Sequence, residues 1–145
     1  MALANSNTHV FPAHSASPWR NGALAAVISV VLNVVLFLVG RAADLIPETV
    51  SVQSPTGEGP MTAGPVIVMS IVPVVVAMLV YRILRRTTAR PARVFRIVGG
   101  GLLVVSLLLP FGIPDVPAKM ALTLDLMHVM TGLAILILVP RVEEG

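Results

Sequence analysis

The sequence contains no cysteine and few charged or aromatic residues. Charged residues make up 12% of the 145 positions, and Phe, Trp and Tyr together make up 4%. Without cysteine the chain has no disulfide, thiolate metal site, iron–sulfur cluster or cysteine nucleophile. The charged share is roughly half that of an ordinary globular domain, and a small soluble domain has too much surface to hide the remaining apolar side chains. These shortages point to a chain that faces lipid.

Apolar side chains are abundant instead, at 56% of the residues. A helix that crosses a bilayer needs roughly 20 predominantly apolar residues. Four runs approach that length, and the third is the shortest. The sequence predicts an all-α bundle of four transmembrane helices in one domain, residues 23–140, between a mobile polar tail at 1–22 and a C-terminal tail at 141–145. The predicted spans are about 23–40, 63–84, 95–113 and 120–140.

Basic charge is concentrated between the second and third spans. Six of the ten basic residues lie there, and no acidic residue accompanies them: Arg82, Arg85, Arg86, Arg90, Arg93 and Arg96. Loops rich in Lys and Arg stay cytoplasmic, so both termini are expected in the cytoplasm and the loop 42–62 outside. The arginines are also expected to bind anionic lipid headgroups, each contributing about 1 kcal/mol. This pattern indicates an integral membrane protein with the bilayer as partner, and no nucleic acid.

Five polar residues interrupt the predicted spans: Asn33, Ser70, Ser106, Asp125 and His128. At 1.5 Å of rise per residue they lie about 6 to 14 Å below the outer ends of their helices, so they form a layer in the outer half of the membrane. Ionisable groups inside a span are costly unless they face protein or water, which makes them candidates for function.

Helical spacing places Asp125 and His128 on one face of the fourth span, together with Ala121 and Gly132. In the first span Asn33 falls on a stripe of small and polar residues. We therefore expect Asn33 and His128 to come within hydrogen-bond reach, directly or through a water molecule.

Two interpretations of this layer stay open. In the first, Asn33, Asp125 and His128 satisfy one another and hold the helices in register. In the second, Asp125 and His128 share a proton or bind a polar ligand. One histidine and one carboxylate are too few for a closed metal site. No nucleophile–base pair is visible either, so we expect no metal, no cofactor and no enzymatic activity.

The chain resembles a family of small four-helix membrane proteins of actinobacteria, domain of unknown function 6069. The resemblance covers roughly Ala23–Val139 and rests on the Asn33-centred first span, on GPVIVMSIVPVVVAMLVYRILRR and RPARVFRIVGGGLLVVSLLLP, and most clearly on LTLDLMHVMTGLAILI, where Met127 and His128 fit the family pattern. It implies a four-span bundle in the plasma membrane and supplies no activity, substrate or cofactor.

The sequence thus supports two functions. The first is a structural or interaction component of the cell membrane, with a second copy or another membrane protein as partner. The second is a small transporter or sensor that uses the Asn33, Asp125 and His128 cluster.

Overall fold

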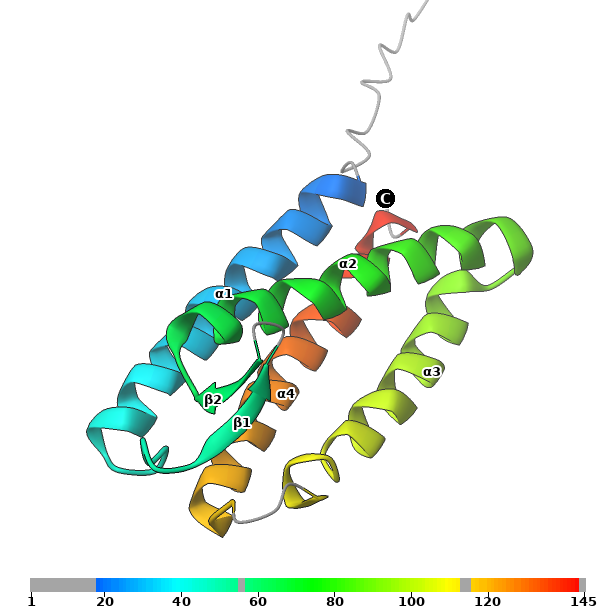
Figure 1. The fold of residues 1–145 in the computed structure, drawn as a ribbon. Helices are drawn as coiled ribbons and strands as arrows, with labels where there is room; N and C mark the ends of the chain where they lie inside the picture. The colour runs from blue at the N-terminus through cyan, green and yellow to red at the C-terminus, as the bar shows by residue number, and fades with distance from the viewer. Residues whose placement is uncertain (1–17, 55–56, 113–115, 144–145) are drawn as a thin grey trace, which may run out of the picture.

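The computed structural model describes residues 18–54, 57–112 and 116–143. Four helices form an elongated bundle (Figure 1): α1 (Pro18–Ala42), α2 (Ala63–Thr87), α3 (Pro91–Ser106) and α4 (Ala118–Leu138). Short 3-10 segments follow the last two, η1 (Pro110–Gly112) and η2 (Val139–Glu143). All four helices, α3 and α4 being extended by these segments, are long and apolar enough to cross a membrane. The predicted all-α bundle of four spans is confirmed.

Several element boundaries differ from the expected ones. α1 begins at Pro18, inside the segment expected to be a tail, and α3 begins at Pro91 rather than near residue 95. Proline suits a first helical turn because the N–H that it lacks would have no partner there. The loop 42–62 also contains an antiparallel hairpin, β1 (Ser51–Ser54) and β2 (Gly57–Pro60). Tail residues 1–17 and 144–145 lie outside the described part of the chain.

Three of the helices form the core, and α3 lies at its side. α1 packs against both α2 and α4, whereas α3 packs mainly against α4 and against the end of α2 (Figure 1). In an apolar stretch of 18 residues within each span, 39% of the residues are buried in α4 but only 11% in α3. Therefore α3 is the helix most exposed to lipid.

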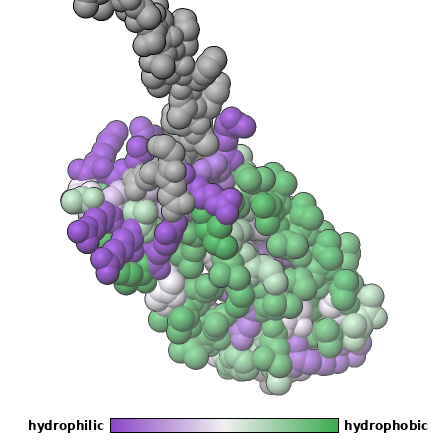
Figure 2. Space-filling view, turned by 180° about the vertical axis from the view of Figure 1, so that it is seen from behind, coloured by the Kyte–Doolittle hydropathy of each residue, from purple (hydrophilic) through white to green (hydrophobic). Residues whose placement is uncertain are grey.

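The outer surface of the bundle is a continuous apolar belt. Large side chains such as Val31, Leu102 and Leu108 point outward and are more than half exposed. Figure 2 shows the belt between two hydrophilic ends. A patch of this extent is unfavourable in water and is matched by the hydrocarbon of a bilayer.

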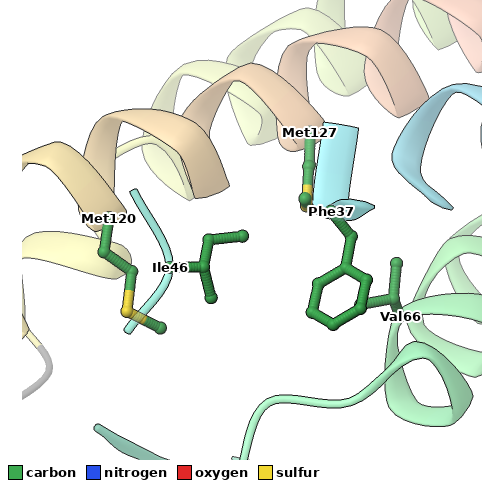
Figure 3. Packing of buried hydrophobic residues seen from close by; sticks show 5 residues of the cluster. All are labelled: Phe37, Ile46, Val66, Met120 and Met127. Carbon is green, nitrogen blue, oxygen red and sulfur yellow. The ribbon is translucent and has the colours of Figure 1, made fainter. Parts of the chain in front are cut away.

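An apolar cluster closes the end of the bundle that carries the hairpin. It consists of Phe37, Ile46, Val66, Met120 and Met127 (Figure 3). Ile46 lies just beyond α1 and is 1% exposed. The chain turns back there because the N–H groups of residues 45 and 46 both donate to the carbonyl oxygen of residue 40. The cluster therefore anchors the loop after α1 onto α2 and α4.

A contact between the loop and α4 reinforces this turn. Asp44 has a φ of 52°, in the left-handed region that Asp tolerates better than most residues. The Lys119 ammonium donates to the Asp44 carboxylate at 2.8 Å and also to its backbone carbonyl. The loop is thus tied to the first turn of α4.

Candidate functional site

A buried hydrogen-bonded node joins three helices near the middle of the bundle. The Nδ2 atom of Asn33 on α1 donates to Ser70 Oγ on α2 at 2.9 Å and to Thr131 Oγ1 on α4 at 2.8 Å. All three residues are at most 7% exposed. In lipid, where no water competes, such bonds between spans fix the helices relative to one another.

The hydrogen bonds determine how the Asn33 amide is turned. Ser70 Oγ donates its single proton to the Val66 carbonyl at 2.7 Å, so toward Asn33 it can only accept. The amide therefore presents its NH₂ group to Ser70 and Thr131 and its Oδ1 atom elsewhere. Asn33 Oδ1 and Ser29 Oγ, one turn apart on α1, are buried without a hydrogen-bond partner among the described residues.

The buried residues of α1 recur every four positions, which places them on one helix face together with Asn33. Along α1 this spacing aligns Ala25, Ser29, Asn33 and Phe37, all of which are buried. Residues four apart share a helix face. The small side chains of this face allow a close approach. A Cβ on Gly22, for example, would lie 2.0 Å from the Met78 sulfur of α2. The node is thus the polar centre of a tightly packed apolar face.

His128 does not join this node. The direct hydrogen bond expected between Asn33 and His128 is not formed: both amide protons of Asn33 are donated to Ser70 and Thr131, and its Oδ1 atom has no partner among the described residues. The half-buried His128 ring instead places Nδ1 2.8 Å from the Leu124 carbonyl of its own helix.

The rotation of α4 explains this difference. The most buried face of α4 runs through Met127, Thr131, Ala134 and Leu138. His128 shares the neighbouring face with Gly132, four residues later, and a Cβ on Gly132 would lie 2.6 Å from Leu103 of α3. The face that was expected to point toward α1 therefore points toward α3.

The other two predicted polar residues also lie away from the node. Asp125 is half-buried, and its Oδ1 atom is buried without a partner among the described residues. Because it lies seven residues before Gly132, it shares the face of α4 that Gly132 turns toward α3. Ser106 donates to the Leu103 carbonyl of its own helix at 2.7 Å. The predicted layer is thus divided into a node on α1, α2 and α4 and separate polar residues beside α3.

Thr131 is the residue that sequence reasoning missed. Its signal was present, since it is a hydroxyl within an apolar run and lies four residues after Met127. The Asp125–His128 pair drew attention to the neighbouring face, and helical periodicity alone does not say which face meets α1.

A second candidate site is the arginine-rich end of the bundle, where α1 starts, α2 ends, α3 starts and α4 ends (Figure 1). The arginines at this end are exposed: Arg20, Arg82, Arg85, Arg86, Arg90, Arg93, Arg96 and Arg141. α3 adds the positive end of its helix dipole here, with no acidic residue in its first turn. Basic residues therefore outnumber acidic ones at this end, where η2 ends at Glu143.

The opposite end is acidic, and its two basic residues are paired. Arg41 contacts Glu48 at 2.7 Å and Lys119 contacts Asp44 at 2.8 Å. Glu58 on the hairpin is exposed there as well. Charge is thus segregated between the two ends of the bundle.

Two hollows lie at the arginine-rich end. The first, of about 700 Å³, is lined by residues 89–93, Arg96 and Ile97. The second, of about 400 Å³, is lined by Arg96, Leu136, Ile137 and Arg141. In both hollows the ionisable side chains are arginines, so both favour an anion.

In the part of the chain that the structure describes, no three His, Asp or Glu side chains come together as the ligands of a metal ion would. His9 and His14 lie outside the described residues. The node itself offers hydroxyl and amide groups of the kind that hold helices together.

Comparison with known proteins identifies a family for this chain but assigns no activity. The model of a family of unknown function, DUF6069, matches residues 13–144. No curated protein and no solved structure matches the chain significantly. Because the match includes all four spans, the node and the arginine-rich end, this chain belongs to the DUF6069 family.

Proposed function

We propose that this multi-pass membrane protein is a structural or interaction component of the plasma membrane that holds its arginine-rich end against anionic lipid headgroups. The segregation of charge carries the proposal. Eight exposed arginines gather at one end, whereas the described part of the other end carries Arg41 and Lys119 together with Asp44, Glu48 and Glu58. Clustered arginines attract anionic headgroups, and the attraction adds up residue by residue.

The interior supports a fixed scaffold. Asn33 uses both amide protons to link α1 with α2 and α4. Neither hollow at the arginine-rich end includes a residue of the node. These features suit a bundle that presents its surface and ends to lipid or to a partner in the membrane.

The same charge pattern supports an orientation. Loops rich in arginine are retained on the cytoplasmic side, so the arginine-rich end and both termini belong in the cytoplasm and the hairpin outside. The absence of cysteine makes this directly measurable. Ser51→Cys on the hairpin and Ala89→Cys in the arginine loop would each introduce a single, exposed thiol.

The topology experiment labels intact cells with a membrane-impermeant maleimide. Ser51→Cys should react in intact cells, and Ala89→Cys only after permeabilisation. The reverse pattern would overturn the orientation. Labelling of both variants in permeabilised cells is the matched control that each thiol is reactive.

The lipid preference of this end can be measured by quenching the fluorescence of the single tryptophan. Trp19 is 64% exposed and lies at the arginine-rich end. In bilayers that mix phosphatidylglycerol with phosphatidylcholine, with one of them brominated, quenching of Trp19 reports which lipid surrounds this end. We expect enrichment of phosphatidylglycerol that weakens with added salt. Equal quenching by both lipids would contradict the proposal.

A second candidate function is a small transporter or sensor. The observation that favours it is Asp125, a carboxylate within a span whose Oδ1 atom is buried and has no partner among the described residues. Because Asn33 is engaged elsewhere, this function would rest on Asp125 and His128 beside α3. A pH-dependent conformational change that disappears in His128→Leu would support it.

A further inference from the structure

The two hollows at the arginine-rich end are neighbours, because Arg96 lines both. Arg90 and Arg93 stand with it in the first hollow, and Arg141 in the second. Each hollow therefore combines at least two guanidinium groups, the group that best matches the paired oxygens of a phosphate.

Apolar surface lies beside these arginines. Ile97 is 66% exposed at the first hollow, and Ile137 is 47% exposed at the second. Arginine at the rim with exposed aliphatic side chains next to it matches a lipid, whose phosphate lies at the interface and whose chains run along the spans.

The seam between α3 and α4 is closed just below the second hollow. A Cβ on Gly99, three residues after Arg96, would lie 2.7 Å from Leu136 Cδ2, so the two helices are in close contact there. The seam therefore leaves no room for an acyl chain between the two helices, whereas the outer faces of α3 and α4 are exposed.

We infer that this end binds one phospholipid with two phosphates, in which a glycerol bridges two phosphatidyl groups, as in cardiolipin. One phosphate occupies each hollow, and Arg96 lies between them. A lipid with a single phosphate fills only one hollow, whereas a short bridge joins two phosphates at neighbouring sites. The inference rests on the proposed placement of this end among anionic headgroups and narrows it to one lipid class.

The experiment compares cardiolipin with phosphatidylglycerol at equal phosphate, using purified full-length protein and native mass spectrometry to count bound lipids. We expect one cardiolipin to be retained about 10- to 30-fold more tightly than phosphatidylglycerol, the effect of roughly two additional arginine contacts. Equal retention per phosphate would overturn the inference.

Paired variants locate the site. Arg90→Gln with Arg93→Gln removes two charges from the first hollow, and Arg96→Gln with Arg141→Gln removes two associated with the second. Each pair should abolish the preference for cardiolipin. Arg82→Gln with Arg86→Gln is the matched control, since it removes two exposed charges at the same end but outside both hollows. This control should keep the preference, and an equal loss in it would refute a defined site.

Thermal unfolding in detergent shows whether each variant is folded. If the double variant Arg96→Gln, Arg141→Gln does not fold, the lipid preference of the double variant Arg90→Gln, Arg93→Gln decides whether the site exists. The outcomes also separate the two proposals. A preference for all anionic lipids without one for cardiolipin leaves the proposed function standing and refutes this inference, and indifference to lipid charge refutes both.

Discussion

Asn33 on α1 donates a 2.8 Å hydrogen bond to Thr131 on α4, 98 residues further along the chain. The same amide nitrogen reaches Ser70 on α2, so one side chain connects the three helices that form the core. This bond, rather than one to His128, sets the register of the first and last spans. Its energetic contribution is measurable.

Removing the node should destabilise the bundle. Asn33→Ala loses both hydrogen bonds, and we expect it to lower the free energy of unfolding by about 1–3 kcal/mol, including the lost packing. Thr131→Val removes one bond at nearly constant shape and should lower it by about 0.5–1.5 kcal/mol. SDS-induced unfolding of the purified protein measures both. The double variant tests the bond itself, because additive losses would mean that Asn33 and Thr131 are not coupled.

Ser29 should behave in the opposite way. Its hydroxyl is fully buried and has no partner among the described residues, so Ser29→Ala removes a desolvated polar group and no bond. We expect stability in the same unfolding assay to stay constant or rise by up to about 1 kcal/mol. A clear loss of stability would show instead that a buried water links this hydroxyl to Asn33 Oδ1.

Glycines of α3 and α4 should respond to substitution according to whether they lie in the seam between the two helices. A Cβ on Gly132 would lie 2.6 Å and 2.8 Å from the two methyl groups of Leu103, whereas nothing lies within 4 Å of one on Gly100. Gly132→Ala should therefore lower the free energy of unfolding by about 1–3 kcal/mol. Gly100→Ala should raise it by up to about 1 kcal/mol, because alanine favours a helix. Equal effects of the two variants would mean that α3 does not pack on α4 as described.

His128 tests the interpretation of the polar residues beside α3. Among the described residues, the hydrogen bond of its ring joins Nδ1 to the Leu124 carbonyl of its own helix, so His128→Leu should fold with nearly wild-type stability. Thermal unfolding in detergent measures this. A loss as large as that of Asn33→Ala would make His128 part of the structural core. A tryptophan fluorescence scan between about pH 5 and 8 on both proteins then reports whether the histidine drives a conformational change.

Much of the fold could be read from composition and spacing. A near absence of charge over four long apolar runs leaves lipid-facing helices as the stable arrangement, because every backbone polar group must be paired inside a membrane. The arginine loop and the acidic loop 42–62 likewise marked the two ends of the bundle. The helix starts at Pro18 and Pro91 were missed because prolines among polar or basic residues look like loop segments, although proline fits a first helical turn and long side chains can reach the interface from within a helix.

The candidate site was only half predictable. Sequence alone picked out Asn33 and Ser70, because a polar residue in a span needs a partner. It could not select Thr131 over His128, since the two lie on adjacent faces of one helix and periodicity does not say how that helix is rotated. Tertiary packing decided this: the apolar and hydroxyl face of α4 meets α1, and the close contact of Gly132 with Leu103 turns Asp125 and His128 toward α3. The clustering of arginine is a property of the sequence, and the first hollow is built from neighbouring residues 89–97, whereas the second hollow exists only because the folded chain brings the start of α3 and the end of α4 together.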